Sequence, residues 1–267
     1  MKGAKQFLKV LVVTVTLVIG MLYLFQERLI FHSTALPNDY VYNFGTTHKE
    51  LFLKAKDGSV LNGLHFKQPN PQGVIIYNHG NAGALDAWGL WAQELSNRFG
   101  YDVVIWDYRG YGKSTGRRRS KVMLDDGLLF YNYSKQLFSE DEIIVFGRSL
   151  GGFFATYIAR NARPAKLILE STPTSLLQIA KNEYPFLPSK YLLKFRFQND
   201  ENITKIEVPT YILHGTEDQL VPFDHGKQLF ERSAAAKKIF YPIKGGEHNN
   251  LDHDFEETYF QALNDIL

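Results

Sequence analysis

The 267-residue chain contains no cysteine, which excludes a disulfide scaffold, a thiolate zinc site, an iron–sulfur cluster and a cysteine nucleophile. Its charges almost cancel, because 30 lysines and arginines oppose 28 aspartates and glutamates, so no basic excess indicates nucleic acid as a partner. The eight histidines show no H-E-x-x-H or similar spacing, and we expect no metal site. The glycines of residues 107–114 do not follow G-x-G-x-x-G, and we expect no nucleotide or other cofactor.

The first thirty residues differ in composition from the rest of the chain. Three lysines within the first nine residues precede an uncharged apolar run at residues 10–25, which is just long enough as a helix to cross a bilayer when its flanks are included. Only Arg28 follows closely, so the positive-inside rule predicts a cytoplasmic N-terminus and an extracytoplasmic (periplasmic or luminal) main domain. We expect residues 1–30 to be an uncleaved signal anchor; a cleaved signal peptide is the alternative.

The remaining sequence predicts an α/β domain with a mostly parallel sheet covered by helices on both faces. Apolar runs rich in β-branched residues alternate with helix-compatible stretches, and apolar residues make up 45% of the chain. The expected strands are 51–55, 60–66, 74–77, 103–106, 143–146, 167–169, 210–213 and 238–241, and the expected helices lie near 84–97, 121–136, 150–160, 224–233 and 255–266. The first two strands flank Asp57-Gly58, which is typical of a hairpin. Ligand sites in such sheets lie at the carboxyl ends of the strands.

A G-x-S-x-G motif, Gly147-Arg148-Ser149-Leu150-Gly151, follows one expected strand and precedes an expected helix. A tight turn at this place strains the serine backbone, and glycines on both sides relieve the crowding. The turn also lifts the hydroxyl to a helix N-terminus, where developing negative charge is stabilised. Ser149 is therefore the candidate nucleophile, and the alternative is a structural serine in a glycine-rich turn.

A serine hydroxyl needs a base that is oriented by an acid, and the sequence offers both in loops after expected strands. Asp218 and His248 follow the candidate nucleophile in the order Ser…Asp…His. The acid would hold the imidazole in the required tautomer, and the imidazole would take the hydroxyl proton. Glu217 or, less suitably, Glu170 could replace Asp218, and His253 could replace His248.

An oxyanion hole needs two backbone N–H groups. We expect one from Leu150, directly after the candidate nucleophile, and one from Asn81 in the loop that follows the strand at 74–77. His79 in the same loop is expected to brace it.

Residues 107–114 follow the next expected strand along the chain. We interpret this segment as a structural turn with an internal interaction between Asp107 and Arg109.

These segments together resemble the α/β-hydrolase superfamily. The matching stretches are His79-Gly80-Asn81-Ala82-Gly83, Asp107-Tyr108-Arg109-Gly110-Tyr111-Gly112, Gly147-Arg148-Ser149-Leu150-Gly151-Gly152, His214-Gly215 with Asp218, and Glu247-His248-Asn249. Within the superfamily the chain is most similar to membrane-anchored serine hydrolases with small caps, which include bacterial inner-membrane hydrolases and eukaryotic relatives that act on acyl-proteins and lysophospholipids. Glu247 departs from the pattern, since relatives often have glycine directly before the histidine.

The resemblance implies an α/β-hydrolase fold over residues 31–267, with an eight-stranded sheet. It implies Ser149, Asp218 and His248 as a catalytic triad, and the amides of Asn81 and Leu150 as oxyanion donors.

The segment 171–207 is too long for a plain turn between two strands, and in these hydrolases such an insertion forms the cap over the active site. It is rich in aromatic, proline and leucine residues between 184 and 195, which suits an apolar acyl group; packing of the cap onto the domain would explain them equally well. Lys190, Lys194 and Arg196 could face anionic headgroups or form a solvated face.

The sequence therefore predicts a serine hydrolase of the carboxylic-ester class that cleaves esters or thioesters of acyl or lipid-like substrates near a membrane, through an acyl-enzyme. A serine peptidase or aminopeptidase-like hydrolase is one alternative. A non-catalytic scaffold on the same fold is another, although it should have lost at least one member of the triad.

Overall fold

The computed structural model describes residues 2–267 and has one eight-stranded sheet at its centre, in the order β1-β2-β4-β3-β5-β6-β7-β8. Strands β1 and β2 form an antiparallel hairpin, β2 is antiparallel to β4, and the remaining pairs are parallel. The bounds are β1 His48–Lys54, β2 Val60–Phe66, β3 Val74–Asn78, β4 Asp102–Trp106, β5 Ile143–Arg148, β6 Lys166–Glu170, β7 Thr210–Gly215 and β8 Lys238–Ile243. The predicted mostly parallel sheet with an antiparallel edge is confirmed.

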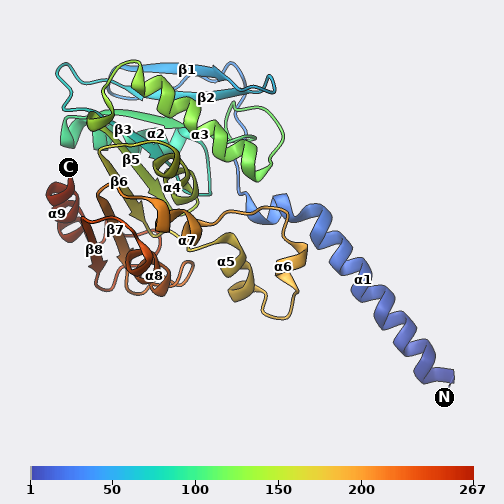
Figure 1. Ribbon diagram of the computed structural model, residues 1–267. Helices are drawn as coiled ribbons and strands as arrows, with labels where there is room; N and C mark the ends of the chain where they lie inside the picture. The colour runs from blue at the N-terminus through green and yellow to red at the C-terminus, as the bar shows by residue number, and fades with distance from the viewer. Residues whose placement is uncertain (1) are drawn as a thin grey trace.

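Helices cover both faces of this sheet (Figure 1). Helices α2 (Leu85–Phe99) and α9 (Glu256–Ile266) pack on one face, and α3 (Ser120–Lys135), α4 (Gly151–Asn161) and α8 (Asp224–Arg232) pack on the other. Each face has its own buried apolar core, because the parallel strands alternate fully buried side chains between the two layers. A short 3-10 turn, η1 (Glu140–Glu142), leads into β5.

The edge strand β1 differs from its predicted range. It begins at His48, three positions before the first expected residue, and it ends at Lys54. Pairing with β2 aligns His48 with Phe66, and this cross-strand register extends the strand into a segment whose own pattern is polar. Ala55 lies outside the strand, because its amide closes the turn by donating to the Ser59 carbonyl at 2.8 Å.

Helix α1 (Lys2–Ile30) is one long helix that projects away from the sheet (Figure 1). It is 29 residues long, and within residues 2–267 it is the one helix with the length and hydropathy to cross a membrane. Most of its apolar side chains are exposed, so the helix does not belong to the core of the α/β domain.

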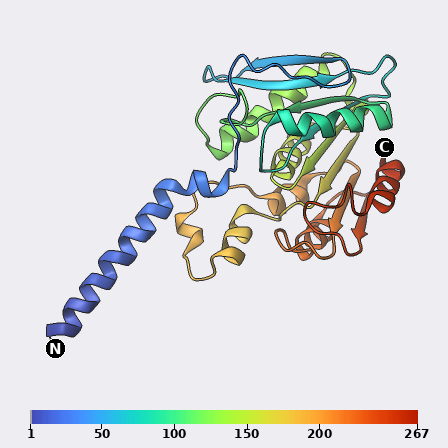
Figure 2. The same ribbon diagram turned by 180° about the vertical axis from the view of Figure 1, so that it is seen from behind.

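The chain between β6 and β7 forms a small helical subregion beside the C-terminal part of α1 (Figure 2). It contains α5 (Leu176–Glu183), α6 (Ser189–Leu192), α7 (Asn199–Asn202) and the 3-10 turn η2 (Ile203–Lys205). We use the word cap for residues 171–207.

The segment directly after α1 runs across the ends of two central strands. Isolated β-bridges join Ser33 to Gly83 and Ala35 to Gly112, in the loops that follow β3 and β4. The N-terminal segment therefore stabilises the carboxyl edge of the sheet, where the candidate site residues lie.

Candidate active site

Ser149 lies in a strained turn between β5 and α4. Its φ angle is 53°, in the left-handed region that side-chain-bearing residues rarely adopt. The turn is too tight for a side chain at either flanking glycine. A β-carbon added at Gly147 would lie 2.6 Å from the Gly151 carbonyl oxygen, and one added at Gly151 would lie 1.9 Å from the Asn78 carbonyl oxygen. Glycine at both positions therefore lets the turn pack directly against the end of β3.

The side chains of Ser149, His248 and Asp218 form a continuous hydrogen-bonded chain. The Ser149 hydroxyl lies 2.9 Å from Nε2 of His248, and Nδ1 of His248 lies 2.7 Å from Oδ2 of Asp218. Since Nδ1 faces a carboxylate, the proton belongs on Nδ1 and Nε2 is left to accept from the serine hydroxyl. His248 and Asp218 are buried, whereas Ser149 keeps partial contact with solvent.

The Asp218 carboxylate is held in place by four groups. Its Oδ1 accepts from the amides of Leu220 and Val221 at 2.9 and 2.8 Å, and its Oδ2 lies near His248 and His214. Burial alone would raise the pKa of this carboxyl, but the hydrogen bonds from His214 and His248 outweigh burial and hold the pKa well below its usual range. Asp218 therefore remains ionised opposite the imidazole.

The alternative acids and base lie elsewhere. Glu217 is exposed, and Glu170 is fully buried with Oε1 at 3.1 Å from Nε of Arg148. Burial raises the pKa of the Glu170 carboxyl. His253 is exposed, and its ring nitrogens contact Asp254 and the Asn249 carbonyl oxygen.

The amides of Asn81 and Leu150 donate no hydrogen bond to any group within residues 2–267. Leu150 follows Ser149 directly, and the loop carrying Asn81 continues from β3, whose Asn78 pairs with Gly147 in the neighbouring strand. The two N–H groups thus belong to adjacent segments at the same edge of the sheet and remain available for an external acceptor.

The side chain of Asn81 links this loop to the end of α1. Its Nδ2 donates to the Ile30 carbonyl oxygen at 2.6 Å, and its Oδ1 accepts from the Tyr111 hydroxyl at 2.7 Å. The same hydroxyl lies 2.8 Å from the Asn81 carbonyl oxygen. These contacts fix the loop from two sides.

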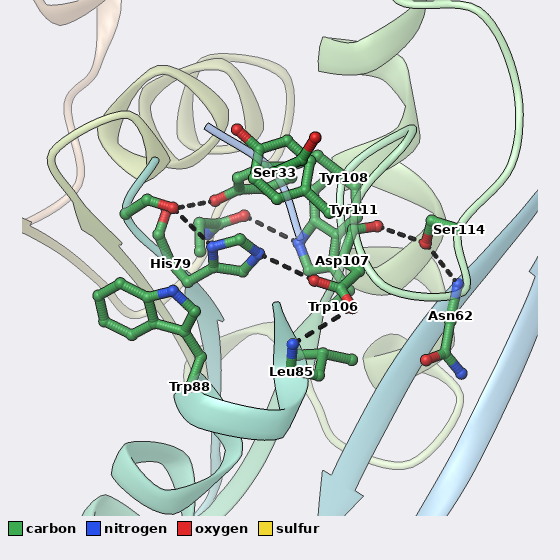
Figure 3. Close-up of polar contacts among 12 residues, drawn as sticks. Ser33, Asn62, His79, Leu85, Trp88, Trp106, Asp107, Tyr108, Tyr111 and Ser114 are labelled. Atoms are coloured by element: carbon green, nitrogen blue, oxygen red, sulfur yellow. Dashed lines mark hydrogen bonds and ion pairs between the residues drawn. The ribbon is translucent and has the colours of Figure 1, made fainter. Parts of the chain in front are cut away.

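A buried network centred on His79 supports the loop that carries Asn81 (Figure 3). The His79 ring stacks on Tyr108 with centroids 4.3 Å apart, and its Nδ1 donates to the Gly80 carbonyl oxygen at 2.7 Å. Its Nε2 lies 3.5 Å from Oδ1 of Asp107, whose other oxygen accepts from the Leu85 amide. Burial raises the pKa of the Asp107 carboxyl. His79 is fully buried, so it holds the loop and does not reach the surface.

The expected interaction between Asp107 and Arg109 is wrong. Arg109 instead pairs with Asp126 at 2.6 Å and with Asp57 at 2.6 Å. Asp107 directly follows β4 and points toward His79, whereas Arg109 lies in the next turn, which the Tyr111 amide closes by donating to the Tyr108 carbonyl oxygen at 2.8 Å. The chain changes direction between the two residues, so their side chains meet different partners.

The contacts of two polar residues near the site were not predicted from the sequence. Nε2 of His214 lies 2.8 Å from the Val221 carbonyl oxygen and 3.4 Å from Oδ2 of Asp218. Asp252 lies 3.6 Å from Nη1 of Arg148. The spacing of His214 four residues before Asp218 was the available signal, whereas nothing in the sequence pairs Asp252 with Arg148.

Comparison with known proteins places these features in a family. The family model described as alpha/beta hydrolase fold matches residues 73–203. The chain is 30% identical to an uncharacterized membrane protein of Saccharomyces cerevisiae, over 100% of this chain and 97% of that protein. It is 31% identical to protein bem46 of Schizosaccharomyces pombe, over 95% and 89%, and 34% identical to lysophosphatidylserine lipase ABHD12 of Danio rerio, over 65% and 50%.

Solved structures share the fold at low sequence identity. An esterase of Pyrococcus furiosus superposes with a TM-score of 0.71 at 18% identity, covering 89% of this chain and 97% of the other. An esterase of Exiguobacterium antarcticum gives 0.62 at 19% identity, covering 84% and 99%. The resemblance seen in the sequence is therefore confirmed, and the chain belongs to the α/β-hydrolase superfamily, with a membrane protein and a lipase among its relatives.

Proposed function

We propose that the protein is a serine hydrolase that cleaves carboxylic esters or thioesters through an acyl-enzyme. The observation that carries this proposal is the chain of contacts from the Ser149 hydroxyl to His248 at 2.9 Å and from His248 to Asp218 at 2.7 Å. A nucleophile and a base within hydrogen-bond reach, with the base oriented by a buried carboxylate, is the arrangement that acyl transfer requires.

In this mechanism His248 takes the proton as the Ser149 oxygen attacks the substrate carbonyl carbon. The amides of Asn81 and Leu150 stabilise the negative charge that develops on the carbonyl oxygen. His248 then donates its proton to the departing alcohol or thiol, which leaves an acyl group on Ser149. Water then attacks this acyl group with the same histidine as base. The carboxylic acid product is released, and the serine hydroxyl is regenerated. Asp218 stabilises the imidazolium in both halves.

We further propose that residues 1–30 anchor the enzyme in a membrane and that residues 31–267 form the hydrolase domain, with the cap at 171–207. The apolar α1 and the excess of lysines before its apolar run support a cytoplasmic N-terminus and an extracytoplasmic domain. The name of the Danio rerio relative, a lysophosphatidylserine lipase, supports an acyl or lipid-like substrate at the membrane surface.

A fluorophosphonate probe tests the serine chemistry directly. Full-length protein should be labelled and Ser149→Ala should not. Ser139→Ala, which changes the exposed N-cap serine of η1, should label like the unmodified protein. A panel of esters, thioesters and aminoacyl amides with increasing acyl length then tests the substrate class. A kcat/KM that rises with acyl length on esters or thioesters supports the proposal, and turnover confined to aminoacyl amides would indicate a peptidase.

A further inference from the structure

A buried glutamine of α1 fastens the cap to this helix. Gln26 is only 7% exposed, and its Nε2 donates to the Leu192 carbonyl oxygen at 3.1 Å while its Oε1 accepts from the Lys194 amide at 2.8 Å. The Lys194 ammonium also lies 4.2 Å from the centroid of the Tyr23 ring. The last turns of α1 are therefore part of the same unit as α6.

These contacts fix the level of the cap along α1. An apolar pocket between the two is lined from α1 by Leu22, Gln26 and Leu29, and from the cap by residues including Tyr184 and Leu187. Leu22 lies three positions inside the apolar run that ends at residue 25, about 4.5 Å of helix axis. The turn between α5 and α6 therefore lies beside the end of the segment that would occupy the bilayer.

The exposed surface of the cap is apolar and basic. Phe186 is 98% exposed and Tyr191 is 81% exposed, which is unusual for rings in a folded domain. Four basic side chains and one acidic side chain, all exposed, accompany them between residues 176 and 196: Lys181, Lys190, Lys194, Arg196 and Glu183. Aromatic rings together with lysine and arginine are the residues enriched where proteins meet lipid headgroups.

We propose that the α5–α6 side of the cap docks into the headgroup layer of an anionic phospholipid bilayer, with the Phe186 ring inserted toward the acyl chains beside α1. This proposal rests on the anchor role proposed above for α1. Docking would hold the carboxyl edge of the sheet against the surface that supplies lipid substrates, because the loop carrying Asn81 is hydrogen-bonded to Ile30 at the end of the same helix.

The absence of cysteine makes a site-specific test possible. Three variants carry one cysteine each, Phe186→Cys, Leu17→Cys in α1 and Leu137→Cys. Leu137 is 51% exposed and follows the C-terminal end of α3, whereas the cap contacts Ser120 at the other end of that helix. Each is labelled with an environment-sensitive fluorophore in the Ser149→Ala background and reconstituted into nanodiscs of phosphatidylcholine and phosphatidylglycerol. Spin-labelled acyl chains then quench any fluorophore that lies in the lipid.

The proposal predicts strong quenching and a blue-shifted emission at positions 17 and 186, and a water-like, unquenched emission at 137. Quenching at 17 with a position-186 signal equal to that at 137 would overturn the cap proposal and leave the anchor standing. Absence of quenching at both 17 and 186 would overturn the anchor and the cap proposal together. Since the background is inactive by design, none of these readings depends on the proposed hydrolase activity.

Discussion

The guanidinium Nε of Arg148, the residue directly before Ser149, lies 3.1 Å from Oε1 of Glu170 at the end of β6. The Tyr259 hydroxyl from α9 donates to the other oxygen of the same carboxylate at 2.8 Å. Nη1 of Arg148 also lies 3.6 Å from Oδ2 of Asp252, four residues after His248. A buried ionic cluster thus joins the turn that carries the serine to the loop that carries the histidine.

Arg148→Met should leave the fully buried Glu170 without its cation. Removing one partner of a buried pair is more costly than removing both, so we expect the free energy of unfolding to fall by about 3 kcal/mol. The double variant Arg148→Met with Glu170→Gln should recover a large part of that loss. Denaturant unfolding of both variants measures the difference, and equal destabilisation would contradict a charge-pairing role for the cluster.

Gly151→Ala should disrupt the turn at Ser149. The added β-carbon would lie 1.9 Å from the Asn78 carbonyl oxygen and 2.7 Å from that of His79, and both are backbone atoms that cannot turn away. We expect the free energy of unfolding to fall by about 1–3 kcal/mol and fluorophosphonate labelling to be lost. Gly20→Ala is the matched control, because nothing lies within 4 Å of its added carbon. Normal stability and labelling of Gly151→Ala would show that the turn is not tightly packed.

Ester hydrolysis should separate the proposed catalytic residues from their neighbours. Ser149→Ala or His248→Ala should lower kcat by about 10⁶-fold, and Asp218→Asn by about 10⁴-fold, since the acid orients and stabilises the base but does not react. Glu217→Gln should leave kcat unchanged, because this side chain is exposed and the imidazole hydrogen-bonds to Asp218 and Ser149 instead. A decrease in kcat in Glu217→Gln as large as that in Asp218→Asn would contradict the assignment of Asp218 as the catalytic acid.

The low pKa of Asp218 predicts a pH-dependent contribution to stability. A carboxyl whose pKa is lower in the folded than in the unfolded state adds stability above its unfolded pKa of about 3.9, and this is lost as the pH falls through the folded-state value. Thermal unfolding of the unmodified protein and of Asp218→Asn should therefore differ most at neutral pH. The difference should narrow below about pH 4, and a constant difference down to about pH 2 would contradict the assignment.

Much of the fold was predictable because it depends on short-range patterns. The apolar runs at 143–146 and 210–213 fall within β5 and β7, and the glycines around Ser149 mark a turn that only small residues permit. The sequence also predicted that Asp218 and His248 lie at the same edge of the sheet. Each follows one of two neighbouring parallel strands, and parallel strands have their carboxyl ends at one edge.

The parts that could not be predicted depend on contacts between distant segments. Arg109 selects Asp126 and Asp57 over its neighbour Asp107 because strand and helix packing decide which carboxylates reach it. Gln26 is one polar residue after an apolar run, and its partners lie more than 160 positions away. Periodicity within a window carries no information on such pairs.

The most direct test of the account is detection of the acyl-enzyme itself. Full-length protein is mixed with a nitrophenyl ester and quenched rapidly, and peptides are then analysed by mass spectrometry. We predict an initial burst of nitrophenol and an acyl group on the peptide that contains Ser149, both absent in Ser149→Ala. Turnover of the ester with the acyl group on another residue, or with no covalent adduct under conditions that trap one, would contradict Ser149 as the nucleophile.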